Sequence, residues 1–231
     1  MLNALVLVAA LSLNGSWDFR FEEDKTLEAV NKLRERGATL VWLYAPGYLN
    51  DNTLESMKRL TGIEFAKVEG PVRMGLNVSE DGRWMGLTRG LAAQAFSPVN
   101  ADAVLGTYEN GMPALSRSKV GDSISYFSGT WQLDLELVKA IEREAGVHVY
   151  CDANDPMEAN DAFFTLHARN PGLKTVKLPR RAGAVVDVFN RRIVARDTDT
   201  FAFDAPLHST HLFYFGEGGD ELLAQLKRPA K

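Results

Sequence analysis

Residues 38–47 read ATLVWLYAPG, an apolar run that ends in an abrupt break. A continuous apolar run of this kind is typical of a strand buried on both faces of a sheet. It follows a helical pattern over residues 24–36, DKTLEAVNKLRER, which Gly37 closes. A second short helix is expected over residues 53–60, just after the break, with Gly62 at its end. Strands and helices therefore alternate around this stretch.

An earlier apolar run, LNALVLVAALSL over residues 2–13, has two interpretations. It can be another buried strand, or Met1–Ala10 can be a secretory signal. No Lys or Arg follows Met1, so the positive region that begins a secretory signal is missing. With 12 residues, the run is also too short to span a bilayer. We therefore expect a strand and a cytoplasmic location, with secretion as the alternative if the segment is a signal.

A strand–helix–strand–helix order at the start of the chain predicts a parallel sheet with right-handed crossovers. The pattern changes after the clearest helix, residues 133–145, because short strand candidates separated by turns then follow one another. These candidates are residues 147–151, 162–167, 175–178, 184–189, 200–203 and 211–215.

The expected fold class is therefore α/β, with a flavodoxin- or amidotransferase-like, mostly parallel sheet and helices on both faces, followed by a small antiparallel all-β domain. We expect the α/β domain over residues 1–146, the β domain over 147–217 and a C-terminal tail over 218–231. The tail carries one short helical pattern.

Composition excludes several classes of protein. The 231 residues are 45% hydrophobic and 24% charged, which excludes a disordered chain and a multi-span membrane protein. A net charge of -4, with no strongly basic block, argues against nucleic-acid binding. Cys151 is the single cysteine, so neither an intrachain disulfide nor a multi-cysteine zinc site can form.

A ligand site is expected where the parallel strands end, because ligands of open parallel sheets bind beyond those carboxyl ends. Trp17, Tyr44 and Tyr48 follow the first two strands and could stack on a sugar ring, with Asn14 or Asp18 supplying hydrogen bonds. The alternative is that these rings pack the edge of the domain or an interface.

No catalytic residue, metal site or cofactor emerges from the other reactive side chains. Cys151 ends a predicted strand that also contains His148, and alternation would place the two side chains on opposite faces. We therefore expect a buried structural thiol. His208 and His211 lie three residues apart without a carboxylate at matching spacing, so a surface or capping role is expected. No G-x-S-x-G elbow and no glycine-rich phosphate loop occurs.

Several phrases together resemble one known family. They are ATLVWLYAPGYLND (38–51), LGTYENGMPALSRSKVGDSISYF (105–127), AGVHVYCDANDPMEANDAFFTLHA (145–168), LKTVKLP (173–179) and HSTHLFYF (208–215). They resemble the C-terminal region of family-42 β-galactosidase-like glycoside hydrolases. Those enzymes carry a catalytic (β/α)8 barrel, then a glutamine-amidotransferase-like trimerisation domain, then a small β domain. Residues 15–24, GSWDFRFEED, also resemble the opening of sugar-binding sandwich domains, an interpretation under which Met1–Ala10 is the signal.

The resemblance implies a non-catalytic accessory or assembly module. Active amidotransferases carry a cysteine nucleophile in the turn that corresponds to Tyr44–Gly47, and this turn has no thiol. The barrel with its catalytic carboxylates has no counterpart in the chain. The implied partners are further copies of the chain or a catalytic barrel domain. Two alternatives remain: a carbohydrate-binding module, or a small hydrolase or amidotransferase-like enzyme that uses Cys151.

Overall fold

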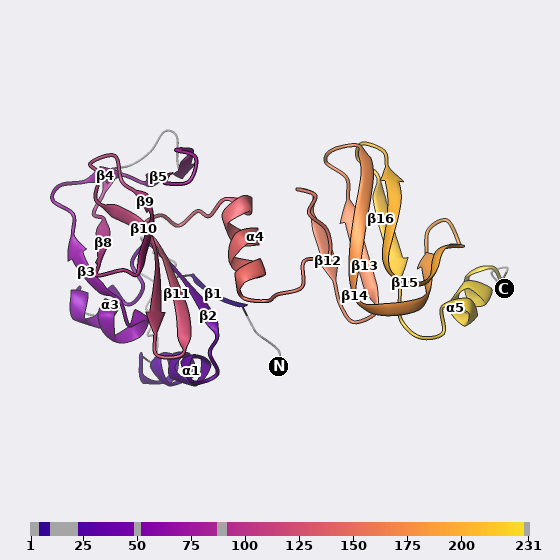
Figure 1. The fold of residues 1–231 in the computed structure, drawn as a ribbon, viewed down its shortest axis with the longest axis horizontal. Coiled ribbons are helices and arrows are strands. Elements are labelled where there is room, and N and C mark those ends of the chain that lie inside the picture. The colour runs from indigo at the N-terminus through magenta and orange to yellow at the C-terminus, as the bar shows by residue number, and fades with distance from the viewer. Residues whose placement is uncertain (1–4, 10–22, 49–51, 87–91, 229–231) are drawn as a thin grey trace, which may run out of the picture. The chain divides into compact units, whose positions relative to one another are not determined.

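The structure is a computed structural model that describes residues 5–9, 23–48, 52–86 and 92–228. The chain divides into two compact units, Met1–Val147 and His148–Lys231, each of which is described by itself (Figure 1). Among the described residues, no helix is both long and apolar enough to cross a membrane.

The first unit is built on a seven-stranded mixed sheet. Its order is β1 (Leu5–Ala9), β2 (Thr39–Leu43), β11 (Ser123–Ser128), β10 (Pro113–Val120), β9 (Ala103–Thr107), β5 (Gly75–Val78) and β6 (Trp84–Gly86). β2 runs parallel to β1 and β11, and the other pairs are antiparallel. Two small antiparallel pairs join β3 (Glu64–Lys67) to β8 (Phe96–Val99) and β4 (Val72–Arg73) to β7 (Ala92–Ala93). The helices are α1 (Glu23–Glu35), α3 (Leu54–Thr61) and α4 (Leu135–Glu144).

β2 is buried on both faces, as its apolar sequence predicts. Leu40 and Trp42 point to one face and pack in a cluster with residues of α1 and α3. Val41 and Leu43 point to the other face and pack with residues of α4. The strand prediction for the first apolar run is confirmed over Leu5–Ala9, which pairs with β2.

The ends of α3 follow directly from the sequence. The Thr53 hydroxyl accepts a hydrogen bond from the Ser56 N–H at 3.2 Å, which caps the first turn. Gly62 adopts a left-handed φ of 76° and donates its N–H to the Lys58 carbonyl at 2.7 Å. The helix predicted over residues 53–60 is confirmed, with Gly62 at the predicted end.

The predicted α/β fold class is wrong. The structure is 44% strand and 19% helix, and the main sheet curls into a half-barrel instead of a helix-flanked parallel sheet. The short connections explain the difference, since a parallel crossover needs about a dozen residues or more. Only Gly121 and Asp122 separate β10 from β11, and the Tyr108 N–H donates to the Met112 carbonyl in the turn between β9 and β10. These hairpins extend the sheet antiparallel beyond β11.

The chain also leaves the main sheet after α3. The next strand, β3, pairs with β8 in a separate two-stranded sheet, so the second strand–helix unit is never completed as a crossover. Three parallel strands are therefore all that remain of the predicted parallel sheet among the described residues.

The second unit is a five-stranded antiparallel sheet followed by a short helix. Its strands, in spatial order, are β12 (Met157–Ala159), β13 (Phe163–His167), β16 (Thr210–Tyr214), β14 (Gly172–Asp187) and β15 (Arg192–Ala205), and the helix is α5 (Gly219–Leu226). β14 forms one strand where the sequence predicted two, because a register shift between Lys177 and Ala182 accommodates residues 178–181 within the strand. Residues 147–151, predicted as a strand, lie outside every strand.

A buried ion pair ties the start of β14 to the loop before β12. Lys174 Nζ lies 2.6 Å from Asp155 Oδ2, and both side chains are almost fully buried. Asp155 Oδ1 also accepts the N–H groups of Arg169 and Asn170. Burial alone would raise the pKa of Asp155, but these hydrogen bonds outweigh burial and lower it. Removing either partner would leave an uncompensated buried charge.

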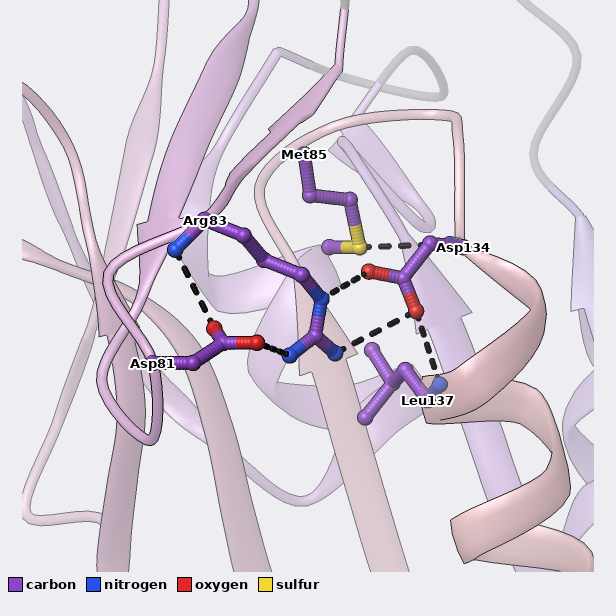
Figure 2. A network of polar contacts seen from close by, with 5 residues as sticks. All are labelled: Asp81, Arg83, Met85, Asp134 and Leu137. Atoms are coloured by element: carbon purple, nitrogen blue, oxygen red, sulfur yellow. Dashed lines mark hydrogen bonds and ion pairs between the residues drawn. The ribbon is translucent and has the colours of Figure 1, made fainter.

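A second polar network fixes the start of α4 to the β5–β6 hairpin (Figure 2). The Arg83 guanidinium lies between two carboxylates, with Nη1 2.6 Å from Asp81 Oδ2 and Nε 2.7 Å from Asp134 Oδ2. Asp134 is the N-cap of α4 and accepts the Leu137 N–H at 2.7 Å. Burial alone would raise the pKa of Asp134, but the Arg83 and Leu137 hydrogen bonds lower it. One carboxylate thus caps the helix and holds the hairpin.

We expect the Asp134→Ala variant to lose about 1–2 kcal/mol of unfolding free energy at pH 7, because the helix loses its cap and Arg83 loses a partner. Asp134→Asn keeps an oxygen for the Leu137 N–H and should lose less. Because folding lowers the pKa of Asp134, its charge stabilises the fold above the unfolded pKa of about 4, and this contribution is lost as the pH falls through the lower, folded pKa.

Urea denaturation at a series of pH values measures these differences. The advantage of the natural chain over Asp134→Asn should be complete at neutral pH and should shrink in strong acid. An advantage that is unchanged between pH 7 and pH 2 would show that the carboxylate charge is irrelevant.

Candidate binding surface at the ends of the parallel strands

The carboxyl ends of β2 and β11 lie at the same edge of the sheet, because these neighbouring strands are parallel. The Tyr44 N–H donates to the Ser128 carbonyl at 2.7 Å and joins the segments that follow the two strands. Asn14 and Trp17, predicted to contribute after the first strand, lie outside the described residues. The candidate surface is therefore described from the segments after β2 and β11.

The turn after β2 has a strained backbone. Tyr44 adopts a φ of 63°, which is uncommon for a bulky residue and costs about 1–3 kcal/mol. Gly47 has a φ of 79°, and a Cβ there would lie 3.1 Å from the Ser56 carbonyl oxygen. A sharp, strained strand-to-helix turn is also the geometry of nucleophile elbows. Here the strained residue is a tyrosine.

Four aromatic rings gather beside this turn, and we call Tyr44, Tyr48, Phe96 and Trp131 the aromatic surface. The Tyr44 ring meets Trp131 edge-on at 5.7 Å between centroids and Phe96 at 6.1 Å. Tyr48 lies 4.6 Å from Phe96. Phe96 is buried at the base, the two tyrosines are half-buried, and Trp131 is 41% exposed. Trp131 is thus the most accessible ring of the group.

The chemistry of Tyr44 does not favour nucleophilic catalysis. Its hydroxyl donates to the Gln94 carbonyl at 3.0 Å. Burial, and then the neighbouring Tyr48, raise the pKa of Tyr44, so its phenol stays protonated at neutral pH. A nucleophile needs a lowered pKa or an adjacent base. The arrangement is suited to ring stacking and to packing against another molecule.

The structure brings together the two described residues of the predicted ligand site. Tyr44 and Tyr48 both contact Phe96, while ligand binding by these residues stays a prediction. Trp131 was missed by sequence reasoning. Its only signal is its position three residues after β11, and this signal becomes useful once β11 is known to run parallel to β2.

The other reactive side chains that the sequence indicates are a cysteine and three histidines, and all of them belong to the second unit. Cys151 is buried, as predicted, but neither it nor His148 lies in a strand, so the argument from opposite strand faces was wrong. His208 is exposed with a φ of 62°, while His211 Nε2 lies 2.7 Å from the Ser209 hydroxyl and burial lowers the pKa of His211. In the part of the chain that the structure describes, no three metal-ligating side chains gather.

The fold is similar to part of two solved β-galactosidases. The β-galactosidase from Bacillus circulans sp. alkalophilus matches with a TM-score of 0.53 and 16% identity over 91% of this chain and 32% of that one. A catalytic mutant of a GH42 β-galactosidase from G. stearothermophilus matches with a TM-score of 0.51 and 17% identity over 81% of this chain and 30% of that one. No family model matches the chain, and no curated protein matches its sequence.

These matches define a class by fold alone, because the identities are low. The resemblance to family-42 β-galactosidases is confirmed as a likeness of fold, and this chain spans about a third of the length of those enzymes. The likeness does not show that the chain contains a trimerisation domain or an amidotransferase-like domain.

We expect Tyr44→Phe to lower the unfolding free energy by about 1 kcal/mol, because the Gln94 carbonyl loses its hydroxyl donor while the ring contacts remain. Tyr48→Phe, which leaves that hydrogen bond in place, is the matched control and should change stability less. Urea denaturation of the two variants measures both values. Equal stability of Tyr44→Phe and the natural chain would show that the hydrogen bond does not hold the turn.

Proposed function

We propose that this chain is a non-catalytic accessory module of a carbohydrate-active enzyme of the β-galactosidase type, and that it holds domains or subunits together. The observation that carries the proposal is the extent of the fold match. It covers 91% of this chain but 32% of a β-galactosidase, so both units together correspond to a minor part of such an enzyme. The proposed partners are further copies of the chain or a catalytic (β/α)8 barrel.

The aromatic surface supports an assembly role. Aromatic residues are enriched at protein interfaces, where large rings supply contact area at a low cost in conformational entropy. Trp131 is 41% exposed and rests against Tyr44, which the turn after β2 holds in place. The protonated phenol of Tyr44 at the strained turn also favours a non-catalytic role.

We expect the purified chain to self-associate in light scattering at micromolar concentration and to leave nitrophenyl β-galactoside and glutamine unchanged. Trp131→Ala should weaken the association about tenfold or more, as the loss of a central interface tryptophan commonly does. Phe189→Ala removes an exposed aromatic ring of the second unit and is the matched control. A strict monomer, or turnover of either substrate, would overturn the proposal.

Carbohydrate binding is a second candidate, because three of the four rings are at least partly exposed at the ends of parallel strands. Under this hypothesis, galactose or a galactoside at millimolar concentration should change the tryptophan fluorescence, and Trp131→Phe should remove most of the change. Trp84→Phe is the control, because Trp84 lies in β6 and is not part of the aromatic surface. A natural chain whose emission and heat of titration do not respond to sugar would exclude this function.

A further inference from the structure

We propose that the side of β14 that faces away from β15, at Leu173 and Thr175 where it is not paired with β16, binds an extended polypeptide segment that adds to the sheet as a further strand. This site belongs to the second unit and the aromatic surface to the first, and the proposal does not depend on the proposed function. Two features distinguish this site: the outward direction of its main-chain groups, and an adjoining pocket beside the exposed Leu173.

The hydrogen bonds of Lys177 establish which way the main chain of β14 points. The Lys177 N–H donates to the Tyr150 carbonyl at 2.7 Å, and the Lys177 carbonyl accepts from His148 Nε2 at 2.7 Å. Its partner in the ladder with β15, Thr200, bonds instead to the Thr198 hydroxyl. Lys177 and Thr200 are therefore a pair that exchanges no main-chain hydrogen bonds, and the N–H and C=O of Lys177 point away from β15.

Leu173 and Thr175 have the same orientation as Lys177, because main-chain direction repeats every second residue along a strand. Their N–H and C=O groups therefore also point away from β15. No hydrogen bond from another described segment reaches these groups, since His148 and Tyr150 bond to β14 only at Lys177. This side of β14 is thus covered by His148 and Tyr150 at Lys177 and by β16 at Val186 and Asp187, and it is open at Leu173 and Thr175.

A pocket of about 270 Å³ adjoins this open edge. It is lined by residues 149–153 on one side and by Leu173, Lys174, Thr175 and Lys177 on the other. Leu173 is 74% exposed, the largest exposed fraction among the exposed large hydrophobic residues of the described chain. The pocket gives room for a guest side chain, and Leu173 gives an apolar contact beside it.

On the opposite edge of the hairpin a side chain satisfies the main-chain groups of Thr200 alone, so the pocket and the exposed Leu173 are what distinguish the proposed edge. On β15, the Thr198 hydroxyl donates to the Thr200 carbonyl at 2.7 Å and accepts the Thr200 N–H at 3.0 Å. A side chain thus satisfies the main-chain groups that would otherwise recruit a strand. Outward N–H and C=O groups in strand register are matched best by another extended main chain, so the expected occupant is a peptide segment with an apolar residue beside Leu173.

The test uses the full chain and hexapeptides displayed on phage, followed by a synthetic form of an enriched peptide. We expect peptides with alternating apolar residues to be enriched. Thr175→Pro removes the outward N–H without removing a bond to β15, and should weaken binding at least about fivefold, the loss expected for one net hydrogen bond. Ala202→Pro, at the paired position on β15, removes an outward N–H from the opposite edge and should bind normally.

Two further readouts keep the proposal testable if Thr175→Pro does not fold. N-methylation of the peptide amides that face β14 should abolish binding. N-methylation of the alternate amides, which face away from β14, should leave binding unchanged. Cys151, the single cysteine, lines the pocket. When the peptide occupies most of the binding sites, the alkylation of Cys151 by iodoacetamide should therefore slow at least about threefold. No enriched peptide, equal loss in both proline variants, indifference to N-methylation, or an unchanged alkylation rate would each overturn the proposal.

Discussion

The burial of β2 on both faces is the constraint on which the first unit depends. Leu40 and Trp42 are completely buried on one side, and Val41 and Leu43 are almost so on the other. A strand in this position must be covered by neighbours in the sheet and by other elements above and below it. β1 and β11 supply the neighbours, while α1, α3 and α4 contribute to the two clusters. The carboxyl end of β2, where the aromatic surface forms, is held in place by the same packing.

The strained turn at Tyr44 differs in its chemistry from a nucleophile elbow. An elbow turn presents a reactive side chain only if that side chain can lose its proton. At Tyr44, burial and then the neighbouring Tyr48 raise the pKa of the hydroxyl, which stays protonated at neutral pH. Strain is therefore used here to position a ring against Trp131 and Phe96, which is consistent with contact between molecules.

In the second unit, the main-chain groups at the strand edges are satisfied at some positions and open at others. The buried ion pair between Lys174 and Asp155 anchors the start of β14, and the pairing with β15 sets the direction of the main-chain groups that follow. On the outer edge of β15, the Thr198 hydroxyl satisfies the main-chain N–H and C=O of Thr200. The side of β14 away from β15 pairs with β16 at Val186 and Asp187 and adjoins a pocket at Leu173 and Thr175, a difference that the alternating sequence of the strand does not reveal.

The sequence by itself determined the local elements: the doubly buried strand at residues 38–44, the helix ended by Gly62, and Tyr44 and Tyr48 at a strand end. These features depend on side chains that are close in the chain, so apolar period and capping residues are sufficient to predict them. Only the tertiary structure decided that tight turns make the sheet mostly antiparallel and that Trp131 joins the tyrosines. Both depend on which distant strands pair, and strand pairing is a long-range choice that no local pattern contains.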